Sequence, residues 1–293
     1  MSAEIVNQRS IEYTSNLRLL SQQMGSKLRG TVMVGNHRGK QAVPVDQIGT
    51  VDVYDVVGRR SNNNFADTPH RRRWVFPQRR AVHDTLDIAD EVENLANPGS
   101  MYAQAQVAAM GRKMDRVILQ ALAGTSTTGE TGTGTEAFDT TNNRIAAGGT
   151  GFTFAKLNQA VRILREQAKD MFSPVTCALG ARAIEDLLDE TKVGSADYNS
   201  VRVLTSGEVN TFMGVTFVPT EEASGTGSPL AVSTDYGAVL YMKSGVHLGI
   251  WEDVNGKVDV LPEMEHTTQI STYANFGATR VEQAKVVWVV YTP

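Results

Sequence analysis

Residues 98–123, PGSMYAQAQVAAMGRKMDRVILQALA, carry the most regular helical pattern in the chain. Asn97 suits the N-cap position, Pro98 suits the first helical position, and Gly124 suits the stop. Apolar side chains recur at helical spacing along one stripe, which consists of Val107, Met110, Met114, Val117, Ile118, Ala121 and Leu122. At 1.5 Å per residue the helix is on the order of 38 Å long. Such a length is typical of a spine along which a sheet is laid.

A compact α/β unit is predicted after this helix. Residues 154–168 have the pattern of an amphipathic helix, 175–179 that of a buried strand, and 181–189 that of a short helix. Further strands are expected at 201–204, 214–218, 238–242, 246–251, 257–261 and 285–291, and the last is apolar enough for a central strand. The Gly- and Thr-rich residues 124–153 are expected to form a long flexible loop at the surface or an interface. These elements predict an α+β fold.

Two extended segments before the helix predict a long hairpin. Residues 51–57 alternate apolar and polar side chains as a half-exposed strand does, and residues 71–80 form the second extended piece. A turn rich in Asn, Ser and Pro joins them at 59–69. Because an isolated hairpin is marginally stable in water, we expect this one to lie on another surface.

The N-terminal segment has a different pattern. Residues 3–24 predict an amphipathic helix. The glycine-punctuated residues 25–39 that follow are typical of an extended arm.

Charge is concentrated around the predicted hairpin. It carries Arg59, Arg60, Arg71, Arg72, Arg73, Arg79 and Arg80, with Trp74 and Phe76 among them. A run of acids follows at Asp84, Asp87, Asp90, Glu91 and Glu93. Two solvated faces are the simplest interpretation, and a nucleic-acid patch or complementary subunit surfaces are the functional ones. Because the adjacent acids oppose a polyanion, we favour a subunit interface between Arg59, Arg60, Arg71, Arg72, Arg73 and Trp74 on one side and the acidic run on the other.

The rest of the sequence offers little chemistry. With a net charge of −4, the 293-residue chain is not a strongly basic nucleic-acid binder. Its single cysteine, Cys177, excludes an intramolecular disulfide and is expected to pack as a small apolar residue. The five histidines show no metal-ligand spacing, and residues 35–41 and 132–137 match phosphate- and dinucleotide-binding motifs only imperfectly. No catalytic, cofactor-binding or metal-binding residue is predicted, and no enzyme activity.

Neither a signal peptide nor a bilayer-spanning apolar stretch is recognisable. The protein is therefore expected to be made in a reducing cytoplasm and to have no membrane partner.

The order of parts resembles the HK97-fold major capsid proteins of tailed bacteriophages. Six phrases carry the resemblance over nearly the whole chain: GSKLRG at 25–30, VPVDQIG at 43–49, RRWVFP at 72–77, AMGRKMD at 109–115, GTSTTGETG at 124–132 and FGATR at 276–280. The resemblance implies an N-arm at 1–40, an E-loop at 41–80, a P-domain at 81–150 plus 244–293, and an A-domain at 151–243. The function it implies is self-assembly into an icosahedral shell that encloses phage double-stranded DNA.

The resemblance also implies partners. These are further copies in pentamers and hexamers, a portal and an optional decoration protein, within a virion. Because only about 40 residues precede the E-loop, a separate scaffolding protein is expected. Because the E-loop has no lysine after Lys40, no covalent lysine–asparagine crosslink is expected. The alternatives are an encapsulin-type nanocompartment shell, which shares the fold, and a basic-hairpin nucleic-acid-binding protein.

Overall fold

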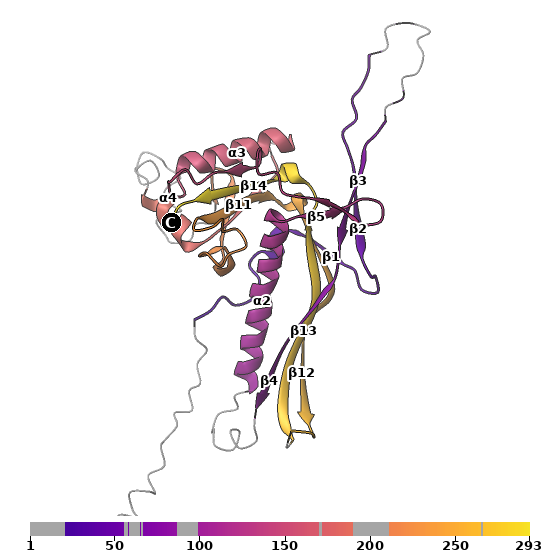
Figure 1. Ribbon diagram of the computed structural model, residues 1–293, viewed down its shortest axis with the longest axis vertical. Helices are drawn as coiled ribbons and strands as arrows, with labels where there is room; N and C mark the ends of the chain where they lie inside the picture. The colour runs from indigo at the N-terminus through magenta and orange to yellow at the C-terminus, as the bar shows by residue number, and fades with distance from the viewer. Residues whose placement is uncertain are drawn as a thin grey trace, which may run out of the picture.

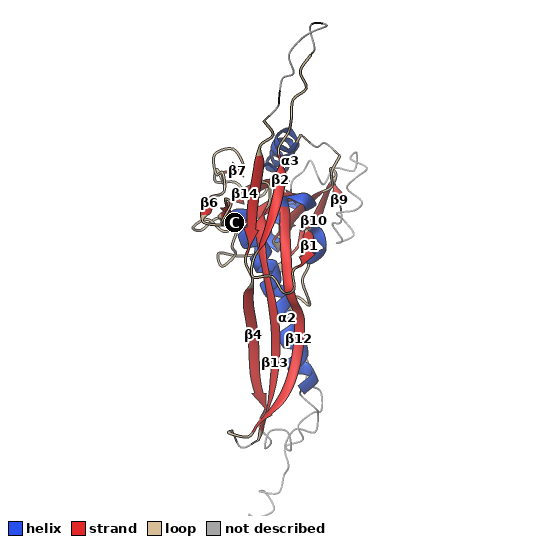
Figure 2. Cartoon of the chain, turned by 90° about the vertical axis from the view of Figure 1, so that its right-hand side faces the viewer, coloured by secondary structure: helices blue, strands red, loops and turns tan. Residues whose placement is uncertain are grey.

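The computed structural model describes residues 21–55, 58, 65, 67–86, 99–169, 172–189, 211–264 and 266–293. They form α-helices and β-strands arranged in an elongated body with a long stem (Figures 1 and 2). Their sheets have four, six and four strands.

The stem consists of one helix on one sheet. Helix α2 (Gly99–Ala123) packs along a sheet of order β1 (Met33–Asn36), β12 (Val246–Leu261), β13 (Thr267–Arg280), β4 (Gln78–Leu86) (Figure 2). Strands β12, β13 and β4 pair antiparallel, whereas β1 runs parallel to β12. The predicted spine is confirmed to within one residue. Its apolar stripe is confirmed at Met110, Met114, Val117, Ile118 and Leu122. Ala121 is only half-buried, and Val107 is 45 % exposed, so neither belongs to this core.

The upper body is a six-stranded sheet between two cores. Its order is β7 (Arg144–Ile145), β14 (Val286–Tyr291), β11 (Tyr236–Met242), β8 (Val175–Leu179), β10 (Val215–Pro219), β9 (Thr211–Phe212). Alternate residues of β14 enter opposite cores: Trp288 and Val290 pack with α2, and Val287 and Val289 pack with α3 (Phe154–Ala168). A strand covered on both faces must be apolar throughout, as β14 is.

Several predictions for this body are confirmed by the structure. The predicted bounds of α3, β8 and α4 (Ala181–Asp189) coincide with those observed. The predicted strands at 246–251 and 257–261 are parts of one long strand, β12. Strand β13, which pairs with it, was not predicted, and residues 201–204 lie outside the described part of the chain.

The hairpin belongs to a third sheet, of order β2 (Val43–Ile48), β3 (His70–Val75), β5 (Ser126–Thr128), β6 (Gly134–Glu136). Strands β2 and β3 pair from Val43–Val75 to Ile48–His70, so the hairpin itself is confirmed. Its first strand was placed wrongly, since residues 51–55 form no strand. The β2–β3 pair is held at its base by a small core in which Val43 and Val75 pack against Trp251.

Two other expectations are corrected. Residues 71–80 are not one strand, because β3 and β4 belong to different sheets. Residues 124–153 are not one long flexible loop: they carry β5, β6 and β7 and bury Phe138, Ile145 and Phe152. Both departures arise because pairing partners distant in sequence order these segments.

Of the helix predicted at 3–24, residues 3–20 lie outside the described part and residues 21–24 are not helical. Residues 25–28 instead cross α2 beside Gly111 and Asp115 and lead into a single 3-10 turn (Arg29–Thr31) before β1.

Candidate functional site

The base of the hairpin is fixed by ion pairs within the chain. Across the β2–β3 pair, Arg72 Nε lies 2.5 Å from Asp46 Oδ1, and this contact lowers the pKa of the Asp46 carboxyl. Arg73 is 3 % exposed; its Nη2 lies 2.7 Å from Glu136 Oε2, and its Nε donates to the Val281 carbonyl at 3.2 Å. These arginines are therefore engaged inside their own subunit.

Aromatic side chains and glycines complete this base. Trp74 Nε1 donates to the Gly129 carbonyl at 2.8 Å, and the Trp74 ring lies against Gly132, where a β-carbon would come within 3.1 Å of the ring. Gly277 lies directly beneath the Phe76 carbonyl oxygen, with no space for a β-carbon. The hairpin is thus joined to β13 and to the β5–β6 turn by backbone contact.

A second buried guanidinium, that of Arg280 at the end of β13, contacts both the end of α2 and the hairpin sheet, where its Nη2 donates to the Glu136 carbonyl at 3.3 Å. Arg280 Nη1 donates to the carbonyls of Leu122 at 2.9 Å and Gly124 at 2.7 Å, and its guanidinium lies over the Phe138 ring at 5.1 Å. Burial lowers the pKa of Arg280 to about 10, so the group is charged at neutral pH. The carbonyls that end α2 therefore have a cationic donor, which is favourable at a helix C-terminus.

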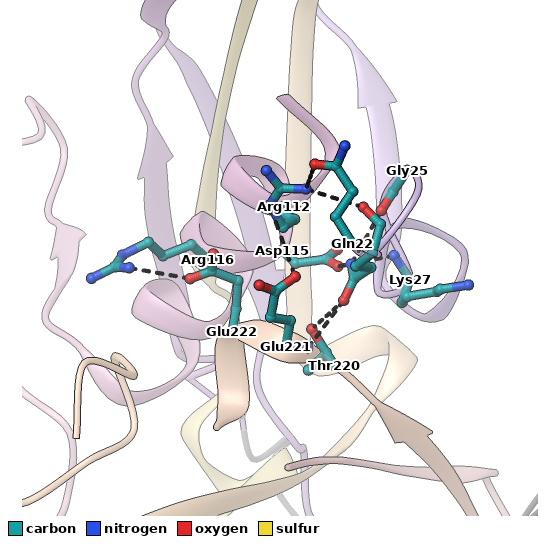
Figure 3. A network of polar contacts seen from close by, with 10 residues as sticks. Gln22, Gly25, Lys27, Arg112, Asp115, Arg116, Thr220, Glu221 and Glu222 are labelled. Carbon is teal, nitrogen blue, oxygen red and sulfur yellow. Dashed lines mark hydrogen bonds and ion pairs between the residues drawn. The ribbon is translucent and has the colours of Figure 1, made fainter. Parts of the chain in front are cut away.

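The N-terminal segment is anchored on α2 by one carboxylate (Figure 3). Asp115, fully buried, accepts from Gln23 Nε2 and the Lys27 amide at Oδ2, and from Ser26 Oγ and the Leu28 amide at Oδ1. These four distances lie between 2.5 and 3.0 Å. Residues 23–28 are thus folded around a single acceptor.

The same face of α2 also reaches the upper body (Figure 3). Arg112 donates to Gln22 Oε1 at 2.8 Å, and Arg116 pairs with Glu222 at 3.2 Å. Gln23 Oε1 accepts from Thr220 Oγ1 and the Glu221 amide. One short stretch of chain therefore ties the stem helix to the segment after β10.

The residues predicted to form the subunit interface differ in how exposed they are. Arg71 and Asp84 are exposed, Arg72 and Trp74 are half-buried, and Arg73 is buried. The remainder lie outside the described residues: Arg59, Arg60, Asp87, Asp90, Glu91 and Glu93. Arg71 and Arg73 are near neighbours on β3, yet only the Arg71 side chain is available to another molecule.

The exposure of large apolar side chains on the hairpin was not foreseen from the sequence. Val53 is 95 % exposed, Phe65 is 89 % exposed and Ile48 is 72 % exposed. In Figure 1 the segments above β2 and β3 extend away from the body. Residues 51–57 carry part of this signal, since their alternation of apolar and polar side chains was interpreted as a half-exposed strand.

The two imperfect phosphate- and dinucleotide-binding motifs coincide with ordinary strands and turns. Gly35 lies on β1, and residues 132–137 form the turn and strand of the β5–β6 hairpin, not the start of a helix. Burial raises the pKa of the Cys177 thiol. Within the described residues, no cluster of three or more His, Cys, Asp or Glu is suited to a metal ion. Nor does that part contain a helix long and apolar enough to cross a membrane.

Comparison with known proteins decides what these surfaces belong to. A family model described as phage capsid protein matches residues 5–292. The chain belongs to the phage capsid protein family. No curated protein matches it.

Solved capsid structures share the fold of this protein. The capsid of Helicobacter pylori bacteriophage KHP30 aligns with a TM-score of 0.73 at 11 % identity, over 99 % of this chain and 98 % of that one. The capsid of cyanophage P-SCSP1u aligns with a TM-score of 0.70 at 15 % identity, over 98 % and 94 %. The capsid of a native GTA particle aligns with a TM-score of 0.71 at 11 % identity, over 99 % and 98 %.

The capsid protein therefore has the HK97-like fold and is a structural subunit of a phage shell. Neither the nanocompartment nor the nucleic-acid-binding alternative is favoured. The phrases that carried the resemblance meet in space. Those at 25–30 and 109–115 form the Asp115 anchor, and those at 72–77, 124–132 and 276–280 form the hairpin base.

Proposed function

We propose that the capsid protein builds an icosahedral shell around phage double-stranded DNA by laying its hairpin on a neighbouring copy. The observation that carries this proposal is the exposure of three large apolar side chains on the hairpin, Ile48, Val53 and Phe65. Burying a side chain of this kind contributes about 1.5–3 kcal/mol, so leaving three exposed is costly for an isolated subunit. A second copy is the partner that a shell provides at every position.

The position of the hairpin favours a head-to-tail contact. The coloured segments that continue from β2 and β3 extend away from the body, and the stem of α2, β12 and β13 extends in the opposite direction (Figure 1). A contact between unlike surfaces closes into rings when the rotation between subunits allows it. Such closure is what pentamers and hexamers require.

Charge gives this contact its orientation. The groove beside β3, about 610 Å³ in volume, is lined by three arginines and three carboxylates: Arg71, Arg72, Arg73, Asp46, Glu130 and Glu136. Since its charges balance, it is poorly suited to a polyanion. We assign Arg59, Arg60 and Arg71 to pairing with the acidic run Asp84, Asp87, Asp90, Glu91 and Glu93 of a neighbour, which favours register more than affinity. Arg72, Arg73 and Trp74 hold the hairpin in position for that contact.

The division into N-arm (1–40), E-loop (41–80), P-domain (81–150 plus 244–293) and A-domain (151–243) is part of the proposal. Strand β14 pairs with β11, so the P-domain chain would complete the A-domain sheet. We also infer a non-catalytic role, assembly in the bacterial cytoplasm, a separate scaffolding protein, a portal, an optional decoration protein and no covalent crosslink.

The test is assembly of the full chain, expressed with and without its genomic neighbours and sized by gel filtration and negative-stain microscopy. Wild-type protein is expected to form shells or rings of megadalton size. The double variant Val53→Ser/Phe65→Ser is expected to keep the melting temperature of the unassembled subunit and to lose most of this assembly. The matched control Val53→Ile/Phe65→Leu, which keeps both side chains apolar, is expected to assemble.

Assembly of the serine variant at the wild-type level would show that the hairpin does not provide the contact. A persistent monomer that binds DNA at moderate salt would overturn the shell proposal itself.

A further inference from the structure

Two histidines that are far apart in sequence meet where the N-terminal segment joins the stem. His37 Nε2 lies 2.8 Å from His247 Nε2, with ring centroids 5.1 Å apart. His37 follows β1, and His247 lies near the start of β12, which pairs parallel with β1. The two rings are thus held between neighbouring strands.

Two glycines make room for this pair. Gly35 and Gly249 are directly paired residues of β1 and β12. A β-carbon on Gly35 would lie 2.7 Å from both His37 Nε2 and His247 Cε1, and one on Gly249 would lie 2.9 Å from His37 Cδ2. The imidazoles therefore occupy a slot in the sheet that any side chain at either position would fill.

The pair is linked to the base of the hairpin through Trp251. The His37 ring packs on the Trp251 ring at 5.4 Å, and Trp251 Nε1 donates to the Lys40 carbonyl at 2.5 Å. Trp251 also packs against Val43 and Val75, the first pair of the hairpin. Whatever moves residues 37–40 away from β12 therefore disturbs the packing on which the hairpin rests.

We propose that the His37–His247 contact is an acid-sensitive clasp: acidification separates β1 and residues 37–40 from β12 and loosens the base of the hairpin. A hydrogen bond between two imidazoles needs one nitrogen as acceptor. When both rings are protonated, both nitrogens are donors and two like charges lie in contact.

Neighbouring charges do not relieve this repulsion. Lys40, on the same turn, adds a positive charge, and Arg38 is adjacent to His37. Thr279, which faces His247 from β13, is uncharged. Further along β12 lie Glu252 and Asp253; Asp253 is already paired with Arg29 at 2.6 Å. Within the described residues, no carboxylate accepts a hydrogen bond from either ring.

Burial followed by the charge of Lys40 lowers the pKa of His37, and burial followed by the charge of His37 lowers that of His247 to about 4. A released imidazole titrates near 6.5. Between these values the open form binds more protons than the closed one, so the closed form is favoured at neutral pH and weakens as pH falls from about 6.5 toward 4. Because solvent screens the partly exposed rings, we expect a shift toward the open form on the order of ten-fold between pH 7 and pH 5.

Hydrogen exchange of the purified full chain, followed by mass spectrometry and corrected for the intrinsic effect of pH, tests this. Peptides covering 33–41 are expected to lose protection on the order of ten-fold at pH 5 relative to a peptide covering β11. The variant His247→Gln, which cannot be charged, is expected to remove this pH dependence. The matched control His83→Gln, at an exposed histidine of β4, is expected to retain it.

If residues 33–41 and β11 lost protection from hydrogen exchange to the same extent between pH 7 and pH 5, the clasp would be overturned. An unchanged pH response in His247→Gln would overturn it as well. Exchange of the imidazole Cε1 hydrogens in the wild-type chain gives a second readout that depends on no variant. It is expected to place the pKa of His247 well below 6.5, and an ordinary value there would also overturn the proposal. Neither measurement requires that the protein assemble, so a failure of the clasp proposal can be distinguished from a failure of the shell proposal.

Discussion

Gly111 of α2 and Gly25 of the N-terminal segment lie in backbone contact. A β-carbon on Gly111 would fall 2.6 Å from the Gly25 Cα atom and 2.8 Å from the Ser26 nitrogen. No real side chain fits there, so position 111 must be glycine if residues 25–28 are to reach Asp115. The helix accepts an intrinsically unfavourable residue at its centre in order to bind the chain that crosses it.

Gly111→Ala is therefore expected to destabilise the protein. In an exposed helix the same change would stabilise by up to about 1 kcal/mol, whereas the overlap with Gly25 and Ser26 is expected to cost about 1–3 kcal/mol. Urea unfolding of the unassembled subunit measures the sign. The control Gly256→Ala, where a β-carbon meets nothing within 4 Å, is expected to have little effect. A more stable Gly111→Ala variant would mean that residues 25–26 do not lie on α2.

The carboxylate of Asp115 is expected to fix residues 23–28 against the spine. Asp115→Asn replaces one acceptor oxygen by a donor that faces other donors, leaving buried N–H or O–H groups without a partner. We expect a loss of about 3 kcal/mol in the free energy of unfolding, and faster amide exchange at 23–28. The exposed Asp84→Asn serves as control and is expected to change stability by less than about 0.5 kcal/mol. Equal effects of the two substitutions would contradict the anchor.

The local spacing of apolar residues was sufficient to predict many of the helices and strands of this fold. The helices at 98–123, 154–168 and 181–189 and the strand at 175–179 were predicted because apolar spacing and punctuation agree there. Strand β13 was missed because its sequence, TTQISTYANFGATR, is polar and small. Two of its polar groups have a partner on the spine: Thr272 Oγ1 donates to Gln106 Oε1, and Gln106 Nε2 donates to the Ile270 carbonyl.

The functional surfaces were predictable only in outline. The arginines of β3 could be recognised as a charged cluster, but Glu136 and Asp46, which neutralise two of them, lie in other segments. Asp115 is separated from its donors by 87 to 92 residues, and no spacing rule connects them. One sequence shows which groups need partners but not which partners the fold supplies.

Arg280 is expected to be required for the join between α2 and the hairpin sheet. Arg280→Met removes the donor to the Leu122 and Gly124 carbonyls and is expected to cost about 3 kcal/mol. Arg280→Lys keeps a charge but cannot reproduce the planar fork, so it is expected to recover only part of this loss. Thermal unfolding of both variants, beside Arg182→Met on the exposed face of α4, measures the difference. Full recovery by lysine would show that charge alone matters there.

Lys156 holds the segment before α3 by a cluster of carbonyl oxygens. It is 8 % exposed, and its Nζ donates to Ala147 at 2.6 Å, Thr150 at 2.8 Å, Gly151 at 3.1 Å and Val290 at 3.3 Å. Burial lowers the pKa of this ammonium, with the charges of Asp235 and Asp186 opposing the shift.

Lys156→Met keeps the aliphatic stem of the side chain and removes every one of these bonds. We expect a loss of about 2–3 kcal/mol in the free energy of unfolding, because four inward-facing carbonyls lose their donor. Amide exchange is expected to accelerate at 147–151 and not within α2. Lys113→Met, at an exposed position of α2, is the matched control and is expected to be nearly neutral. If both lysine variants unfold at the same urea concentration as the wild type, the carbonyls at 147–151 are satisfied by water and Lys156 does not order this segment.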